Sequence, residues 1–184
     1  MEEKIFATGK MFELVHFPQA DGRVFEMARR APGVRVIVAV MPNKKVMLTK
    51  EHRWELKGWD YRLPGGKVFD TLAEYETHRK MAKDILVAAT AKAKAEAAEE
   101  AGIQVDAVEL FKKSSLGATV EWDLYIFEAT AWQPHTDGQN LQEDERMGIE
   151  VRWYSFAEAE DLILTGQMQE ERVALVLLQW LKKQ

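Results

Sequence analysis

Apolar and polar residues alternate in short, strand-like stretches at the start of the chain. KMFELVHF and RVFEMARR flank PQADG, whose Pro, Asp and Gly predict a hairpin turn. The β-branched run VRVIVAVM, residues 34–41, is typical of a buried strand, and VMLTKEH predicts its neighbour after a PNKK turn. We therefore expect a small antiparallel unit over residues 1–30, ahead of a larger domain over residues 31–184.

A long helical stretch follows the Pro-Gly-Gly break in YRLPGGKV. Thr71 and Glu74 have the spacing of a capping box, and neither Gly nor Pro interrupts the chain before Gly102. A single helix of about thirty residues would span about 45 Å, so a break into two helices within residues 84–90 is an equal alternative. Gly102 is predicted to end the helix.

The remaining third of the chain predicts strands and then helices. AVELFKKS and EWDLYIFEATAW are strand-like, a polar loop follows, and IEVRWYSF alternates as a last strand. Ser155 and Glu158 fit a capping box that begins a helix over residues 156–164, and another helix is expected over residues 169–183. This order of elements predicts an α+β fold without regular βαβ alternation.

Composition narrows the class of protein. The net charge is -5, so the chain as a whole has no electrostatic attraction to nucleic acid or to an anionic membrane, and a phosphate ligand needs local cations or a metal. The absence of cysteine excludes disulfides, thiolate zinc sites and cysteine nucleophiles. No apolar run reaches roughly 18 residues and the N-terminus lacks an apolar segment, which predicts a cytoplasmic protein.

Three glutamates near the end of the helical stretch carry the candidate chemistry. In AEAAEEAGI, Glu96, Glu99 and Glu100 share one helix face, because residues three and four apart are neighbours. Their repulsion costs only about 0.2–0.5 kcal/mol per pair, so a solvated charged stripe is one interpretation. The other is that a divalent cation neutralises them, since Mg²⁺ prefers carboxylate oxygens and keeps waters and substrate phosphates as further ligands.

Together, LPGGKV and AEAAEEAGI resemble the Nudix box, G-x5-E-x7-R-E-U-x-E-E-x-G-U, where U is a bulky apolar residue. Gly66 stands for its first glycine, and its second half is matched by Glu96, Glu99, Glu100, Gly102 and Ile103. The box glycine and Glu96 are 30 residues apart where the family has 15, which predicts a helical insertion at about residues 72–86. Fifteen residues are about 4.2 helical turns, so a continuous helix would nearly keep its phase.

Two box residues depart from the family pattern. Ala95 stands where the family has an Arg that helps to orient the glutamates, and the nearby cations are Lys92 and Lys94. The early box glutamate has no secure equivalent: counting forward from Gly66 gives Leu72, and counting back from Glu96 gives Val87. Glu74 or Glu76 could substitute for it. We expect these departures to affect rate more than metal binding.

Segments outside the box are similar, in order, to ADP-ribose pyrophosphatases and related nucleotide-sugar hydrolases. These are RRAPGVRVIVAV with KVMLTKEHRWEL, SSLGATVEWDLYIFEA, and EDERMGIEVRWYSFAEAEDLILTGQM. The resemblance implies a Nudix-type α/β/α sandwich with a mixed central sheet, and a homodimer that uses the N-terminal strands. It also implies hydrolysis, with Mg²⁺ or else Mn²⁺ as the metal, of a nucleoside diphosphate linked to another moiety, such as ADP-ribose or a nucleotide sugar. The alternatives are a catalytically weak nucleotide-binding module and a nucleoside triphosphate pyrophosphohydrolase.

The resemblance gives each candidate site residue a role. Metal ligands would be Glu96, Glu99, Glu100 and the backbone carbonyl of Gly65. Substrate contacts would come from Arg53, Gly66, Gly117 and Glu121. Glu100 would also be catalytic, and the general base would be Glu145 or, as second choice, Glu143, in the acidic loop before the last strand; Glu121 is the next candidate.

Several of these residues also have an ordinary structural interpretation. The acidic loop would otherwise be a solvated turn, and Arg53 would otherwise be an ordinary surface residue. Trp54, Trp59 and Tyr61 would either stack on a base or, as we expect, belong to the core. Arg62 stands where the resembled subfamily usually has Glu, so its substrate does not transfer directly to this chain.

Overall fold

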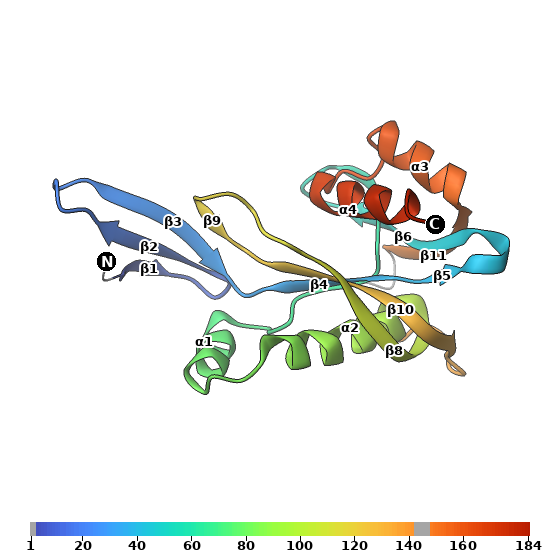
Figure 1. Cartoon of the computed structure of the whole chain (residues 1–184), viewed down its shortest axis with the longest axis horizontal. Helices are drawn as coiled ribbons and strands as arrows, with labels where there is room; N and C mark the ends of the chain where they lie inside the picture. The colour runs from blue at the N-terminus through green and yellow to red at the C-terminus, as the bar shows by residue number, and fades with distance from the viewer. Residues whose placement is uncertain (1–2, 142–147) are drawn as a thin grey trace.

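The computed structural model describes residues 3–141 and 148–184 (Figure 1). In chain order its elements are β1 (Lys4–Thr8), β2 (Phe12–Pro18), β3 (Val24–Arg30), β4 (Gly33–Ile37), β5 (Ala39–Val40), the 3₁₀ turn η1 (Met41–Asn43), β6 (Lys45–Arg53), β7 (Gly58–Arg62), α1 (Leu72–Lys80), α2 (Ile85–Ala101), β8 (Ile103–Ser114), β9 (Val120–Glu121), β10 (Leu124–Pro134), β11 (Ile149–Ser155), α3 (Phe156–Leu164) and α4 (Glu171–Leu181). In this part of the chain no helix is long and apolar enough to cross a membrane.

The strands of the main domain lie between helices. One sheet has the order β4-β10-β8, in which β10 runs parallel to β4 and antiparallel to β8. The other has the order β11-β6-β5, with β7 paired to β6. Helix α2 lies on one side of these strands, and α3 and α4 lie on the other (Figure 1). The predicted α+β fold is therefore confirmed as an α/β/α sandwich with mixed strand directions.

Strand β4 and the short segment after it contribute to both cores. Val34, Val36 and Val38 pack with the α2 side, and Ile37 packs with the α3 and α4 side. All four side chains are fully buried, which explains why the strand reads as a continuous apolar run instead of an alternating one. On α2, small residues at every fourth position, Ala89, Ala93, Ala97 and Ala101, let the helix approach the sheet closely.

The long helical stretch is broken into two helices. Helix α1 ends at Lys80, and α2 begins after Asp84, whose side chain accepts a hydrogen bond from the Leu86 amide. The two-helix alternative is thus confirmed, although the break lies at residues 81–84, earlier than the predicted 84–90. Helix α1 occupies the range of the expected insertion, and the insertion itself stays a prediction. Of the apolar residues in the insertion, Ile85 packs partly against the α2-side core, whereas Met81 is 59% exposed. Gly102 ends α2 with φ 62°, as predicted.

The N-terminal strands form a separate sheet of order β1-β2-β3-β9. The predicted hairpin is confirmed, and the sheet gains β9 from a segment nearly a hundred residues away. The buried Arg29 guanidinium joins these parts: it donates to Glu121 at 2.8 Å, to Glu13 at 2.9 Å and to Glu3 at 2.6 Å. The sheet is therefore tied to the main domain by charge as well as by backbone pairing.

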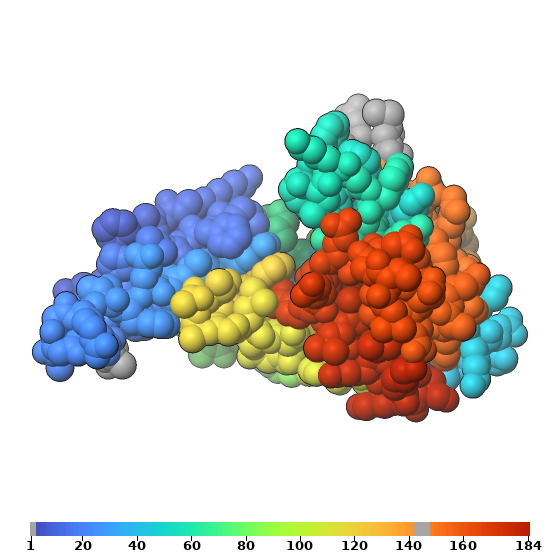
Figure 2. All heavy atoms as spheres, turned by 90° about the horizontal axis from the view of Figure 1, so that it is seen from above, coloured from blue at the N-terminus to red at the C-terminus, as the bar shows by residue number. Residues whose placement is uncertain are grey.

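The N-terminal sheet protrudes as its own lobe (Figures 1 and 2). Large apolar side chains remain exposed on it, among them Phe6 at 67% and Val24 at 52%. An apolar hollow of about 560 Å³ lies on the same lobe and is lined in part by Phe17, Phe25 and Met27. A homodimer would cover such surfaces, and it stays a prediction.

Replacing the central arginine should loosen this lobe. Arg29→Gln leaves Glu13 buried without its charged partner, so we expect a loss of about 3–5 kcal/mol in the free energy of unfolding, measured by urea denaturation. The matched control is Arg23→Gln, which removes an exposed pair with Asp21 at 2.7 Å and should cost at most about 1 kcal/mol. Equal losses in the two variants would show that the Arg29 network does not hold the lobe.

Candidate active site

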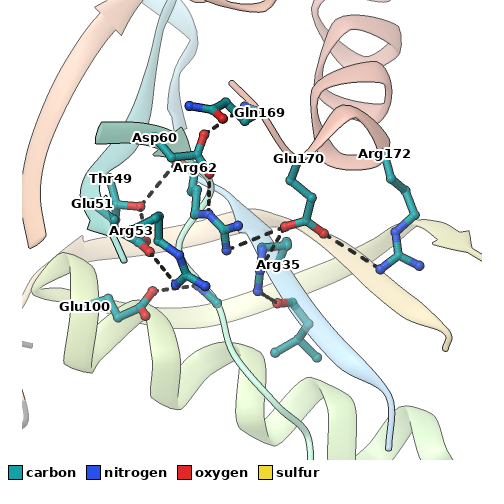
Figure 3. A network of polar contacts seen from close by, with 12 residues as sticks. Arg35, Thr49, Glu51, Arg53, Asp60, Arg62, Glu100, Gln169, Glu170 and Arg172 are labelled. Atoms are coloured by element: carbon teal, nitrogen blue, oxygen red, sulfur yellow. Dashed lines mark hydrogen bonds and ion pairs between the residues drawn. The ribbon is translucent and has the colours of Figure 1, made fainter. Parts of the chain in front are cut away.

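A cleft of about 760 Å³ is lined by many of the residues in the polar network of Figure 3. Its lining comes from the end of β3, from β4, β6 and β7, from the loops after β6 and β7, from the end of α2, from the residue after β9, from the start of β11 and from the residues just before α4. Acidic side chains gather at the α2 end, and arginines gather at the α4 end. The cleft therefore joins two oppositely charged regions.

The Gly-Gly loop is clamped between β4 and α2. Gly65 has φ 150°, and a Cβ there would overlap the Val34 carbonyl oxygen. A Cβ on Gly66 would overlap the Glu96 carboxylate. The carbonyls on either side of Gly65 accept from β4, at 2.9 Å each, and the Gly65 amide donates to Glu100 at 2.7 Å. Two glycines are needed because backbone and carboxylates approach the loop from both sides.

Three buried carboxylates lie around this loop. Glu51, Glu96 and Glu100 are each exposed by less than a tenth. Burial, and then the charge of Glu51, raise the pKa of Glu100 to about 8. Burial also raises the pKa of Glu96, although the Lys92 ammonium at 3.0 Å opposes that effect. The carboxylates thus lie close enough to repel one another where little water screens them.

The donor set at this end suits a hard cation. Within the described ranges, no three His, Asp or Glu side chains approach closely enough to enclose a metal ion by themselves. Mg²⁺ rarely uses such closed cages and usually takes one or two carboxylates, several waters and substrate phosphates. The Gly65 carbonyl receives no hydrogen bond from this part of the chain, unlike those of Pro64 and Gly66. Glu96, Glu100 and Gly65 therefore fit an open Mg²⁺ site.

Glu99 and Glu51 change the predicted ligand set. Glu99 is half-buried and lies near enough to Glu96 for its charge to raise that residue's pKa, and neither Glu99 nor Glu96 is among the residues that line the cleft. Glu51, which was not predicted, does line it and accepts from the Thr49 hydroxyl at 2.8 Å. The available signal was strand alternation: Glu51 shares a strand face with Met47, which packs on the α2 side.

Arginines occupy the other end of the cleft. The Glu170 carboxylate lies 3.1 Å from Arg35 and 3.7 Å from Arg62 (Figure 3). Arg62 also donates to the fully buried Asp60 at 2.7 Å, and Asp60 accepts from the Gln169 amide at 2.8 Å. These pairs join β4 and β7 to the start of α4, across more than a hundred residues of sequence.

The predicted substrate contacts divide into two groups. Arg53 and Gly66 line the cleft, and Arg53 lies 2.6 Å from Glu55 and 3.6 Å from Glu51. Gly117 and Glu121 do not line it, and Glu121 is bound to Arg29 on the N-terminal sheet instead. The two predicted bases, Glu143 and Glu145, lie outside the described residues.

The aromatic residues before the loop differ in their surroundings. Trp54 lines the cleft and is 85% exposed, and Trp59 is 42% exposed, so the expectation that they belong to the core was wrong. Their indoles instead flank His52 in edge contacts, each with a 5.5 Å separation of ring centroids. Tyr61 meets the expectation, because it packs on the α4-side core and against Tyr154.

Comparison with known proteins supports the fold. No family model and no curated protein sequence matches the chain. Among solved structures it is similar to one titled "Crystal structure of ADP compounds hydrolase", with a TM-score of 0.67 and 19% sequence identity over 100% of this chain and 93% of that one. The fold is a Nudix-like α/β/α sandwich. At this identity the likeness shows the fold alone, and the residues of the cleft must carry any argument about activity.

The clamped loop gives a direct test of this geometry. Gly65→Ala places a methyl group against the β4 backbone at a φ that side chains rarely adopt. We therefore expect its free energy of unfolding, measured by urea denaturation, to be about 1–3 kcal/mol lower than that of wild type. Gly58→Ala, on the neighbouring strand β7, is the control, because its Cβ would meet only the Leu56 carbonyl, at 3.7 Å. A Gly65→Ala protein as stable as the control would disprove the clamp.

Proposed function

We propose that this protein hydrolyses the diphosphate bond of a nucleoside diphosphate linked to another moiety, with ADP-ribose or a nucleotide sugar as the leading substrates. One observation carries the proposal: the buried Glu100 carboxylate accepts from the Gly65 amide in the lining of the cleft, with Glu96 one helical turn away. The similar solved structure is described as an ADP compounds hydrolase, which agrees with this substrate class.

Each end of the cleft has a part in the proposed reaction. A bound Mg²⁺ ion would neutralise the diphosphate and lower the pKa of an attacking water. Glu96 and Glu100 would hold that ion against the loop, whose glycines let phosphate oxygens approach the backbone. Arg53 lies on the same wall and can turn from Glu55 toward a phosphate, because its pair with that exposed residue is weak.

The exposed Trp54 indole supports the nucleoside part of the proposal. It stands at the lining of the cleft with 85% of its surface free, and a base stacked on an indole gains about 1–3 kcal/mol. The His52 ring is in edge contact with the indole. A nucleobase on Trp54 would leave the diphosphate directed into the cleft toward Glu100.

Removing the charge of Glu100 should separate catalysis from folding. In Glu100→Gln the amide oxygen can still accept from Gly65, so the fold should persist while Mg²⁺-dependent turnover of ADP-ribose falls by roughly 10²-fold or more. Mg²⁺ should raise the melting temperature of the wild type, as any ligand of the folded state does, but not that of the variant.

Controls make this result specific. Glu99→Gln should show a loss in the same assays if Glu99 completes the ligand set. Glu160→Gln, on α3 and paired with Lys182 away from the cleft, should match wild type in both assays. Mg²⁺ that stabilises Glu100→Gln as much as wild type would end the metal proposal. Tight binding of ADP-ribose without hydrolysis by the wild type would instead favour a binding module.

The general base can be assigned by a pair of substitutions. A positioned base contributes about 10²–10⁴-fold, so Glu145→Gln should lower turnover by that factor while the Mg²⁺-induced rise in melting temperature stays unchanged. Glu143→Gln is measured in parallel as the second choice. If both variants stay within about threefold of wild type, the acidic loop is not the source of the base.

A further inference from the structure

Most of the cations around the cleft already have anionic partners. Among the described residues, the lysine and arginine side chains that line it are Arg30, Arg35, Arg53, Arg62 and Lys67. Arg35 and Arg62 both pair with Glu170, at 3.1 Å and 3.7 Å (Figure 3). Arg53 lies 2.6 Å from Glu55. A diphosphate that enters the cleft would compete with a carboxylate for each of these three arginines.

The other two cations of the lining differ in how they are held. Arg30 lies over two aromatic rings, with its guanidinium carbon 4.3 Å from the Trp122 centroid and 5.0 Å from the Phe12 centroid. Lys67 is exposed, and within residues 3–141 and 148–184 its ammonium forms no ion pair, hydrogen bond or ring contact. In this part of the chain, Lys67 is therefore the cleft cation that can bind an anion without giving up a contact.

The backbone on both sides of Lys67 is fixed. The carbonyl before it, that of Gly66, accepts from the Val34 amide at 2.9 Å. The amide after it, that of Val68, donates to the Pro32 carbonyl, also at 2.9 Å. These bonds enclose Lys67 and tie it to the start of β4. Its backbone therefore has a set position directly after the glycine pair, while its flexible four-carbon side chain can turn toward a ligand.

We propose that Lys67 is a substrate-binding residue whose ammonium contacts the diphosphate in the cleft. An ammonium is a compact charge with three donors, and charge-assisted hydrogen bonds to phosphate oxygens are among the strong ones. Arg53 has the smaller part, because it must leave Glu55 before it can bind a phosphate. The inference rests on the proposed function, since it names the residue that holds the diphosphate of that substrate class.

The test measures binding of a diphosphate without turnover. Calorimetry is carried out on the full chain with a chelator present. One ligand is ADP-ribose, and the other is inorganic pyrophosphate, which carries a diphosphate without a nucleoside. We expect Lys67→Gln to bind both about tenfold more weakly than wild type, because a hydrogen bond to a charged group contributes at least the corresponding free energy. Lys67→Arg keeps the charge and should stay within about threefold of wild type.

Further variants make the result specific. Lys80→Gln is the matched control, because Lys80 is exposed at the end of α1 and lies outside the lining of the cleft; it should bind both ligands as wild type does. Arg53→Gln should weaken binding less than Lys67→Gln does. The melting temperature of Lys67→Gln should equal that of wild type, because the ammonium makes no contact that supports the fold.

Several results would overturn the role of Lys67. Lys67→Gln that binds both ligands as tightly as wild type would refute it, and so would a wild type that binds neither. An equal loss in Lys67→Arg would show that the charge is not what matters. A larger loss in Arg53→Gln would assign the diphosphate to that arginine. Because hydrolysis is not measured, a wild type that binds pyrophosphate through Lys67 but hydrolyses no ADP-ribose would keep this inference and refute the proposed reaction alone.

Discussion

The position of the Gly65–Gly66 backbone between β4 and α2 is the constraint on which the acidic end of the cleft depends. On one side the loop pairs with β4, and a Cβ on Gly65 would meet the Val34 carbonyl. On the other side Glu96 and Glu100 press against the loop from α2. The alanines of α2 permit this close approach, since bulkier residues would hold the helix off the sheet. Packing that stabilises the domain therefore also places the carboxylates.

Local pattern was sufficient for most elements of the fold but not for the pairing of distant charges. The capping residue Ser155 and the terminating Gly102 each act on their own helix end, and α3 and the end of α2 lie where the pattern placed them. The run VRVIVAVM was predicted as one strand, and the structure divides it into β4, which ends at Ile37, the short β5, and the start of η1. Glu96 and Glu100 were found because one helix turn brings them together. Arg35 and Glu170 are 135 residues apart, and only the packing of α4 beside β4 makes them neighbours. No local period encodes that contact.

Buried charge in this protein is concentrated where it serves a cleft. Arg35 interrupts an otherwise apolar strand, and Glu51 sits on the inward face of β6, so both violate the pattern of the elements that carry them. Buried ions are costly unless they are paired, and among the described residues Arg35 keeps one buried nitrogen, Nε, without a hydrogen-bond partner. Sequences break local rules mainly at functional sites, which is why these two residues are stronger indicators of function than the charged face of α2 alone.

Helix α1, which occupies the range of the expected insertion, does not share a helix with the glutamates. A continuous helix through the insertion would tie the orientation of Glu96 to the number of inserted residues, since each residue turns the helix by about 100°. The chain avoids this by ending α1 at Lys80 and starting α2 afresh at the Asp84 cap. The orientation of α2 is then set by its own contact with the sheet. Ala95 offers no cation to the glutamates. Lys92, which is one turn before Glu96 on the same helix, places its ammonium 3.0 Å from the Glu96 carboxylate.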